Sequence, residues 1–293
     1  MARVLVTGAT GNVGREVVRV CSARGLTVRA AVREPSAAHA AAAETVNLDF
    51  LDRSTWAPAL TGCDFVFLLR PPPLGDMKNT LCPFIEAAEG AGVRHIVFLS
   101  VEGADRMEWV PHRKVERHLL ASSLSWTVLR PGFFAQNLQD AYRRDIVDDG
   151  RIYVPAAGAR VAFVDSADLA EVTARVFEHP DSHRGQALTL TGSKAVSFDE
   201  VAHLLSAELG RPIRYQAASI FGYGWHLRTK RRLPLMQIIV QTVLHVGLRR
   251  GGAEQVDPTL ERVLGRPARR TEQYIHDAAP LWRRRSSAAG AFV

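Results

Sequence analysis

Residues 4–14 read Val-Leu-Val-Thr-Gly-Ala-Thr-Gly-Asn-Val-Gly, a strand-like run that leads into three glycines spaced G-x-x-G-x-x-G. In a strand, loop and helix unit, Gly8 permits a tight turn, Gly11 lets the backbone approach a diphosphate, and Gly14 lets the helix pack close to the strand. The helix N-terminus offers N–H groups and partial positive charge to the anion. A glycine triplet can be a purely structural turn, but the order of elements favours dinucleotide binding. The contacts are expected from Thr7, Gly8, Thr10, Gly11, Asn12, Val13 and Gly14.

The first half of the chain alternates apolar strands with amphipathic helices. This alternation is typical of a parallel sheet covered by helices on both faces. We therefore predict an α/β fold, a doubly wound parallel sheet of the Rossmann-like type. The predicted strands are 3–6, 26–32, 45–48, 64–69, 95–99 and 126–129, and the predicted helices are 12–24, 36–43, 54–60, 77–89 and 110–121.

The second half is less regular, and we expect it to form a smaller, helix-rich substrate lobe. The expected domains are an NAD(P)-binding domain over 1–150 and a C-terminal lobe over 151–293. Strand 160–164 and helix 166–178 are expected to pack back on the first domain. Such a lobe would lie over the carboxyl ends of the strands, where open α/β sheets bind ligands. The other predicted elements are helix 133–147, strand 187–190, helix 198–209 and a packed or lid helix within 233–248.

Two positions bear on the choice between NADP and NAD. Arg33 stands at the end of the second strand, where a cation suits the 2′-phosphate of NADP, and Glu34 follows it as a possible partner for the 2′-hydroxyl of NAD. We favour NADPH over NADH. Asp49, after the third strand, is expected to accept from the adenine amino group or to serve as a turn residue.

Charge is distributed unevenly along the 293 residues, which carry a net charge of +7. Residues 211–293 hold 15 Lys and Arg against 5 Asp and Glu. A basic end suits nucleic acid, an anionic membrane surface or solvated helices. We favour solvated helices and do not expect nucleic acid as a partner. The longest apolar stretch, 233–248, is shorter than the roughly 20 residues of a membrane-spanning helix.

The three cysteines lack a C-x-x-C pair, and the N-terminus lacks a signal-peptide core, so we expect a reducing cytoplasm. His179 and His183 are four residues apart, but Pro180 breaks the helix that would align them, and no metal is assigned. The G-x-S-x-G, H-E-x-x-H and Walker motifs are absent from the sequence. The Tyr-x-x-x-Lys pair of standard short-chain dehydrogenases is also absent.

Several motifs together resemble the NmrA-like family, an atypical branch of the short-chain dehydrogenase/reductase class. They are Val6–Gly14, Phe67–Pro72, His95–Ser100, His112–Glu116, Trp126–Asn137, Val164–Ala170 and Val263–Pro267. The family includes NAD(P)H-dependent quinone and azo or triphenylmethane dye reductases, relatives of isoflavone reductases, and NADP-sensing regulators without turnover. The resemblance implies cofactor contacts from Leu69 and Arg70, although relatives often carry a small polar residue in place of Arg70.

His112 is the main acid/base candidate. By its distance from Trp126, it occupies the place where isoflavone reductase relatives carry their lysine. Glu116 follows one helical turn later and is expected to interact with His112. A histidine that titrates near neutrality can protonate a substrate oxygen after hydride transfer, although a surface histidine paired with Glu116 is the alternative. Ser100, at the tip of the fifth strand, is expected to bind a substrate carbonyl or to cap the strand.

Residues 130–137 are expected to form the nicotinamide wall, where Pro131 keeps the backbone open and Phe133 and Phe134 stack on a planar ring. Core packing is expected for at least one of the two phenylalanines. Phe221, Tyr223 and Trp225 are expected to line an aromatic substrate entrance or to belong to the core.

The sequence thus predicts an NADPH-dependent oxidoreductase that reduces a conjugated carbonyl, a quinone or an aromatic polyketide. One alternative is an NADP(H)-binding redox sensor without turnover. Another is a tailoring enzyme of secondary metabolism, for example one for reductive coupling of aromatic polyketides. A planar aromatic small molecule is the expected partner, and a homo-oligomer is a further expectation.

Overall fold

The computed structural model describes residues 2–34, 41–72 and 74–283. The chain divides into two compact units. The first unit comprises Met1–Gly132, Ser166–Thr191 and Asp257–Ala268, and the second comprises Phe133–Asp165, Gly192–Val256 and Arg269–Val293. Both units are discontinuous, in contrast to the expected single boundary near residue 150. Helix 166–178 belongs to the first unit, whereas residues 160–164 belong to the second.

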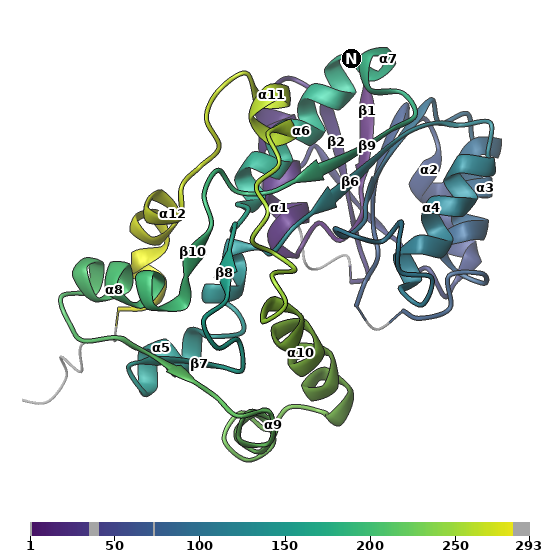
Figure 1. Cartoon of the computed structure of the whole chain (residues 1–293). Helices are drawn as coiled ribbons and strands as arrows, with labels where there is room; N and C mark the ends of the chain where they lie inside the picture. Colours follow the sequence, from purple (N-terminus) through teal and green to yellow (C-terminus); the bar gives the residue numbers. More distant parts are fainter. Residues whose placement is uncertain (1, 35–40, 73, 284–293) are drawn as a thin grey trace, which may run out of the picture. The chain divides into compact units, whose positions relative to one another are not determined.

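The first unit is built on a seven-stranded sheet in the order β3-β2-β1-β4-β5-β6-β9 (Figure 1). Every neighbouring pair is parallel, as predicted for a doubly wound sheet. The strands are β1 (Arg3–Val6), β2 (Thr27–Val32), β3 (Glu44–Asn47), β4 (Phe65–Leu69), β5 (His95–Leu99), β6 (Ser125–Pro131) and β9 (Gln186–Leu190). The order reverses between β1 and β4, which is the point where such sheets bind ligands.

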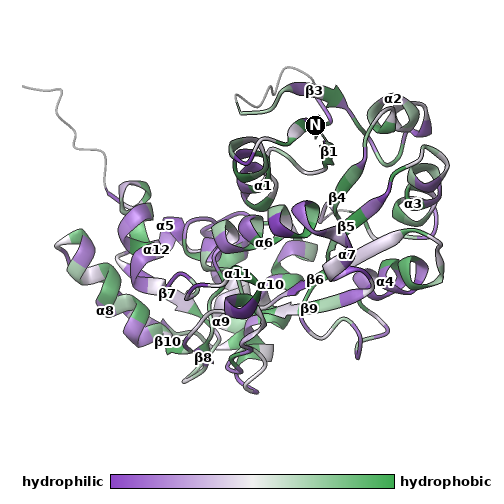
Figure 2. Ribbon diagram, turned by 90° about the horizontal axis from the view of Figure 1, so that it is seen from above, coloured by the Kyte–Doolittle hydropathy of each residue, from purple (hydrophilic) through white to green (hydrophobic). Residues whose placement is uncertain are grey.

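Helices cover both faces of this sheet (Figures 1 and 2). On one face, Trp56, Phe84 and Leu119 pack with strand residues such as Val66 and Ile96 in one buried cluster. The helices on that face are α2 (Trp56–Leu60), α3 (Leu81–Gly90) and α4 (Pro111–Ala121). On the other face lie α1 (Asn12–Ala23) and α6 (Ser166–Glu178). The remaining elements of the first unit are η1 (Arg53–Thr55), α7 (Pro180–His183) and α11 (Thr259–Leu264).

The second unit contains two small sheets and a helical core. Strand β7 (Arg151–Val154) pairs in parallel with β11 (Arg214–Ala217), and β8 (Arg160–Val161) pairs antiparallel with β10 (Val196–Ser197). Helix α8 (Phe198–Leu209) begins with a capping box and ends at Gly210, so helix 198–209 is confirmed. The other elements are η2 (Ala135–Leu138), α5 (Arg143–Asp148), α9 (Ile220–Thr229), α10 (Leu235–Leu248), α12 (Thr271–Ala278) and η3 (Ala279–Leu281).

Two element predictions for the second half were wrong. Residues 133–147 do not form one helix, because the N–H of Ala135 donates to the carbonyl of Val164 and the N–H of Val164 donates to the carbonyl of Phe133. These long-range bonds hold Phe133 and Phe134 extended before η2 begins. The predicted strand 160–164 shortens to β8 for the same reason, since Val164 bridges to Phe134.

Two further predictions concern helices in the first half of the chain. The predicted helix 77–89 begins only at Leu81. The predicted helix 36–43 falls partly on residues 35–40, which lie outside the described residues. Within the described ranges, every helix is too short or too polar to cross a bilayer.

Candidate functional site

The glycine loop between β1 and α1 is closely packed against itself. Gly8 has a φ of +63°, a conformation that strongly favours glycine. A Cβ on Gly14 would lie 2.1 Å from the carbonyl oxygen of Gly8, which is an impossible contact. The N–H of Gly11 closes the loop by donating to that same oxygen at 3.0 Å. The protein's own packing therefore requires glycine at positions 8 and 14.

Gly11 differs from these two glycines. A Cβ there would lie 3.4 Å from the carbonyl oxygen of Gly8, an ordinary van der Waals distance, and the residue is exposed. The chain itself therefore has no steric need for glycine at this position. Gly11 is also the N-cap of α1, whose first turn contains no acidic residue. The first N–H groups of that helix lack intrahelical partners and carry partial positive charge, so the site fits a diphosphate.

The other predicted loop residues differ in their burial. Thr7 is buried, and its hydroxyl donates to the carbonyl of Phe67 at 3.1 Å and accepts from the N–H of Leu69 at 2.8 Å. Thr7 therefore ties the ends of β1 and β4 together. Val13 is buried as well, whereas Thr10 is exposed and Asn12 is half-buried. Leu69 lies beside the loop, since its Cδ2 would be 3.0 Å from a Cβ on Gly8.

Arg33 and Asp49 lie just beyond the carboxyl ends of two neighbouring strands. Val32 of β2 pairs with Asn47 of β3, so both side chains come just beyond the carboxyl ends of these strands. Arg33 is exposed. Asp49 accepts the N–H of Leu51 at 2.9 Å, which gives it the turn role anticipated as the alternative to adenine binding.

His112, in the first turn of α4, faces Arg70 and not Glu116. Nε of Arg70 lies 3.3 Å from Nε2 of His112. Because a guanidinium can only donate, Nε2 accepts and the ring proton resides on Nδ1. The Nδ1 atom is buried and has no hydrogen-bond partner within the described part of the chain. A buried N–H donor without a partner is costly, so it marks a place where a ligand atom would be stabilised.

The expected titration of His112 near neutrality was wrong. Burial, and then the nearby charge of Arg70, lower the pKa of His112 to about 4. At neutral pH the imidazole is uncharged and acts as a hydrogen-bond donor rather than as a charged acid. Burial also lowers the pKa of Arg70, whose guanidinium donates to the carbonyls of Pro72 and Leu74 and so secures the loop after β4.

Glu116 is buried and lies at the centre of a hydrogen-bond and ion-pair network. Its carboxylate accepts from the hydroxyl of Ser100 at 2.5 Å and from two guanidinium nitrogens of Arg130 at 3.1 and 2.7 Å. Arg130 also pairs with Asp105 at 3.1 Å. The expected interaction between Glu116 and His112 is therefore replaced by a bidentate pair that joins α4 to the ends of β5 and β6. Asp105 was not predicted, because a single acidic residue in a loop carries no sequence signal.

The predicted nicotinamide wall contains Pro131, Phe133 and Phe134. Pro131 is buried at the end of β6 in the first unit. Phe133 and Phe134 belong to the second unit and are half-buried. Phe133 packs edge-to-face on Phe163 at 5.8 Å and on His245 at 5.9 Å, so the anticipated core packing of one phenylalanine is found.

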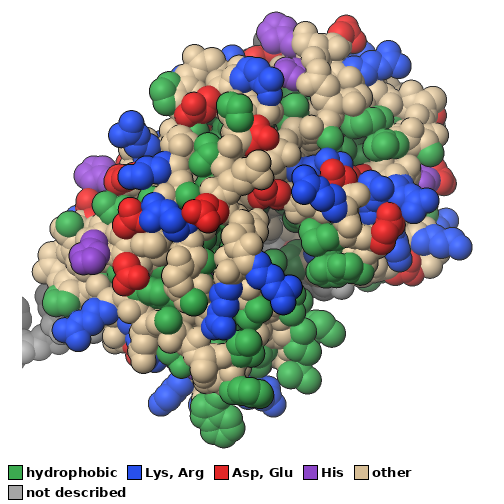
Figure 3. All heavy atoms as spheres, viewed as in Figure 1, with side chains coloured by type: hydrophobic (Ala, Val, Ile, Leu, Met, Phe, Trp, Pro, Cys, Tyr) green, Lys and Arg blue, Asp and Glu red, His purple; other side chains and the backbone are tan. Residues whose placement is uncertain are grey.

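The three aromatics predicted to line a substrate entrance do not share one face of α9. Tyr223 is buried and its hydroxyl donates to Gln241 at 3.1 Å. Phe221 is 91% exposed and Trp225 is 73% exposed. Figure 3 shows hydrophobic side chains gathered in the lower part of the view, over α9 and α10.

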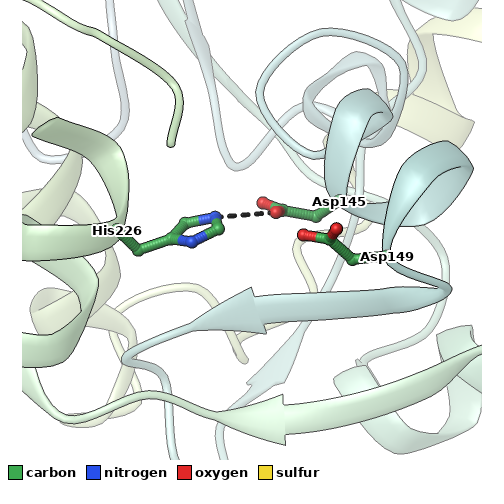
Figure 4. Close-up of side chains that lie close together, drawn as sticks. All are labelled: Asp145, Asp149 and His226. Carbon is green, nitrogen blue, oxygen red and sulfur yellow. Dashed lines mark hydrogen bonds and ion pairs between the residues drawn. The ribbon is translucent and has the colours of Figure 1, made fainter. Parts of the chain in front are cut away.

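Asp145, Asp149 and His226 of the second unit lie close enough together to resemble a metal-ligand set (Figure 4). His226 Nε2 bonds to Asp145 Oδ1 at 2.7 Å. Arg231 also pairs with Asp145, and its Nη2 donates to Asp149 at 2.8 Å. The guanidinium therefore supplies the positive charge between the carboxylates, and this cluster is an ion-pair network.

Comparisons with known proteins place this geometry in context. The model of the NmrA-like family matches residues 1–223. An NAD(P)H azoreductase from Xenophilus azovorans is 34% identical over 226 residues, which are 74% of this chain and 77% of that protein. A (4-alkanoyl-5-oxo-2,5-dihydrofuran-3-yl)methyl phosphate reductase from Streptomyces griseus is 32% identical over 91% of this chain and 94% of its own.

A solved structure of an oxidoreductase is also similar to this chain. The NADPH-dependent quinone oxidoreductase from Escherichia coli, complexed with NADPH, superimposes with a TM-score of 0.83. It is 26% identical, and the match covers 94% of this chain and 99% of that one.

Proposed function

Because the chain belongs to the NmrA-like family, we propose that it is an NADPH-dependent oxidoreductase that transfers hydride to a quinone or another conjugated carbonyl. The observation that carries this proposal is Gly11, where glycine serves no packing need of the protein but leaves the N-terminus of α1 open to a diphosphate. The reductase and oxidoreductase activities of the relatives support the redox class. A reducing cytoplasm suits the proposal, since the three cysteines are buried free thiols.

Different residues of the first unit would bind different parts of the cofactor. The N-terminus of α1 and the backbone of Gly11 would bind the diphosphate, and Arg33 would bind the 2′-phosphate. Pro131 would lie at the nicotinamide end. When bound, the reduced nicotinamide supplies a hydride.

His112 would bind the oxygen of the acceptor through its Nδ1–H. A neutral imidazole that keeps its proton stabilises the negative charge that develops on that oxygen, and solvent then completes the protonation. The pair formed by Glu116 and Arg130 holds α4 against the sheet and so fixes the position of His112. A quinone needs little help from an acid, which suits a site without Tyr-x-x-x-Lys.

The cofactor assignment is tested by replacing Arg33→Ala and measuring the Kd of NADPH and of NADH. Loss of the charge-assisted contact is expected to raise the Kd of NADPH by about ten-fold to a hundred-fold and to leave the Kd of NADH almost unchanged. Arg94→Ala is the matched control, because Arg94 is exposed just before β5, at the amino ends of the strands, whereas Arg33 lies beyond their carboxyl ends. Equal losses for the two cofactors would remove the phosphate assignment.

The reaction is tested by mixing the protein anaerobically with NADPH and a panel of quinones, azo dyes and enones. Loss of absorbance of the reduced cofactor reports turnover. The Streptomyces griseus relative favours adding an oxo-dihydrofuran phosphate, which also tests a role in secondary metabolism. Measurable NADPH binding without oxidation by any acceptor would favour the redox sensor instead.

A further inference from the structure

Helix α10 presents an unusually apolar face to solvent. Its buried side contains Ile238, His245 and Leu248. At 100° per residue, the opposite half of the helix is occupied by large apolar side chains that are 47–68% exposed. They are Leu235, Met236, Ile239, Val240, Val243 and Leu244. A face of this kind usually has a partner.

Helix α9 extends this apolar character. Phe221 and Trp225 are one turn apart on its exposed side, together with Arg228. The two helices pack on one another, since Tyr223 bonds to Gln241 and Gly224 approaches Ile238. We call the exposed apolar residues of both helices the α9–α10 surface (Figure 3).

The segment of the chain that carries this surface is basic. Residues 211–253 contain eight Lys and Arg and no Asp or Glu. Lys230 and Arg232 are exposed between the two helices, and Arg249 and Arg250 are exposed after the end of α10. Arg231 alone among the cations of 228–232 is committed to an internal ion pair, with Asp145 and Asp149. A second copy of the chain would bring like charges together across a twofold axis, so the charge favours an anionic partner.

We propose that the α9–α10 surface binds the interface of an anionic phospholipid bilayer. An apolar helix face bordered by Lys and Arg is the arrangement that inserts shallowly among acidic headgroups. Trp225 and Phe221 are suited to the same depth, since aromatic rings gather at membrane interfaces. Helix α10 has 14 residues, fewer than the roughly 20 that a helix needs to span a bilayer. It would therefore lie parallel to the membrane surface.

Vesicle flotation of the full chain tests this proposal. The expected result is flotation with phosphatidylglycerol/phosphatidylcholine vesicles at low salt, with at least ten-fold weaker binding to pure phosphatidylcholine or at high salt. The double variant Ile239→Gln/Val243→Gln is expected to weaken binding by about ten-fold or more. The matched control is Leu51→Gln/Leu120→Gln, which removes two leucines that are 72% and 57% exposed in the first unit and leaves binding unchanged.

The charges are tested separately with Arg232→Gln/Arg250→Gln, which is expected to weaken flotation by about ten-fold at low salt. Circular dichroism and NADPH binding verify that each variant folds. Failure to float with anionic vesicles, or equal losses in the control pair, would overturn the proposal. Sedimentation of the lipid-free chain supplies the remaining outcome: a dimer that Ile239→Gln/Val243→Gln converts to monomer would assign the surface to a second copy.

Discussion

Arg70 donates a hydrogen bond to His112 across 3.3 Å, and this single contact fixes which nitrogen of the imidazole carries the proton. Nε2 is occupied as an acceptor, so Nδ1–H is the group that remains for a ligand. The cation beside the ring also helps burial to keep the imidazole uncharged. The pair therefore produces a neutral donor that is ready before any substrate arrives.

Replacing His112→Phe is expected to lower kcat by about a hundred-fold while the Kd of NADPH stays constant, because the proposed hydrogen bond would stabilise only the reacting oxygen. In the unmodified protein, kcat should vary little between pH 5.5 and 8, since the pKa of His112 is about 4. Steady-state kinetics with the acceptor found in the panel measures both quantities. His118→Phe, on the same helix, is the control. A titration near pH 6.5 that disappears in His112→Phe would contradict this assignment.

Gly11→Ala should separate cofactor binding from folding. The added Cβ meets only an ordinary contact within the protein, so the free energy of unfolding should change by less than about 1 kcal/mol. The same Cβ should obstruct a diphosphate and raise the Kd of NADPH at least ten-fold. Calorimetric titration and urea unfolding measure the two effects. Gly90→Ala, whose added Cβ would meet no atom within 4 Å, is the control. Unchanged NADPH affinity in Gly11→Ala would remove the basis of the proposed function.

Glu116→Ala is expected to destabilise the protein by about 3 kcal/mol, because it leaves the half-buried guanidinium of Arg130 with only Asp105 and removes the acceptor of the buried Ser100 hydroxyl. Ser100→Ala removes one hydrogen bond to a charged group and should cost about 1–3 kcal/mol. Urea unfolding measures both losses. Glu108→Ala breaks only exposed ion pairs and should change the free energy of unfolding by less than about 0.5 kcal/mol. A similar small change in Glu116→Ala would show that the network contributes little.

Stability should fall as the pH decreases from about 6.5 toward 5. Burial lowers the pKa of His95 and of His245 to about 4, so in this range the unfolded chain binds protons that the folded chain excludes. Each histidine then lowers the free energy of unfolding by up to about 1.4 kcal/mol per pH unit. Urea unfolding at pH 7, 6 and 5 measures this slope. His95→Gln should reduce it, whereas His203→Gln, on the exposed side of α8, should not. A stability independent of pH would contradict the prediction.

The fold was predictable wherever local pattern decides structure. The run from β1 through the glycine loop to α1 was predicted correctly as strand, turn and helix, and the parallel sheet follows from repeated alternation of strands and helices. Residues 133–147 could not be predicted in the same way, because their conformation depends on bonds to Val164. Sequence spacing carries no information about such partners.

The candidate site was predictable in its glycine loop and less so elsewhere. The pairing of Glu116 with Arg130 requires knowing that α4 lies against β6, which no spacing reveals. The i, i+4 rule suggested His112 as the partner of Glu116, but a bidentate guanidinium binds the carboxylate better. One signal was overlooked: on a helix, Phe221 and Trp225 share a face and Tyr223 points away from it.

The first unit is completed only after the chain has left it and returned. Helix α6 and strand β9 follow residues 133–165 in the sequence, and those residues belong to the second unit. Strand β9 pairs with the outer side of β6 through five residue pairs. A recombinant fragment ending near residue 150 would therefore have β6 as a bare, apolar border that invites self-association. Expression of the nucleotide-binding half alone should yield inclusion bodies, and no single protease cut can release that half intact.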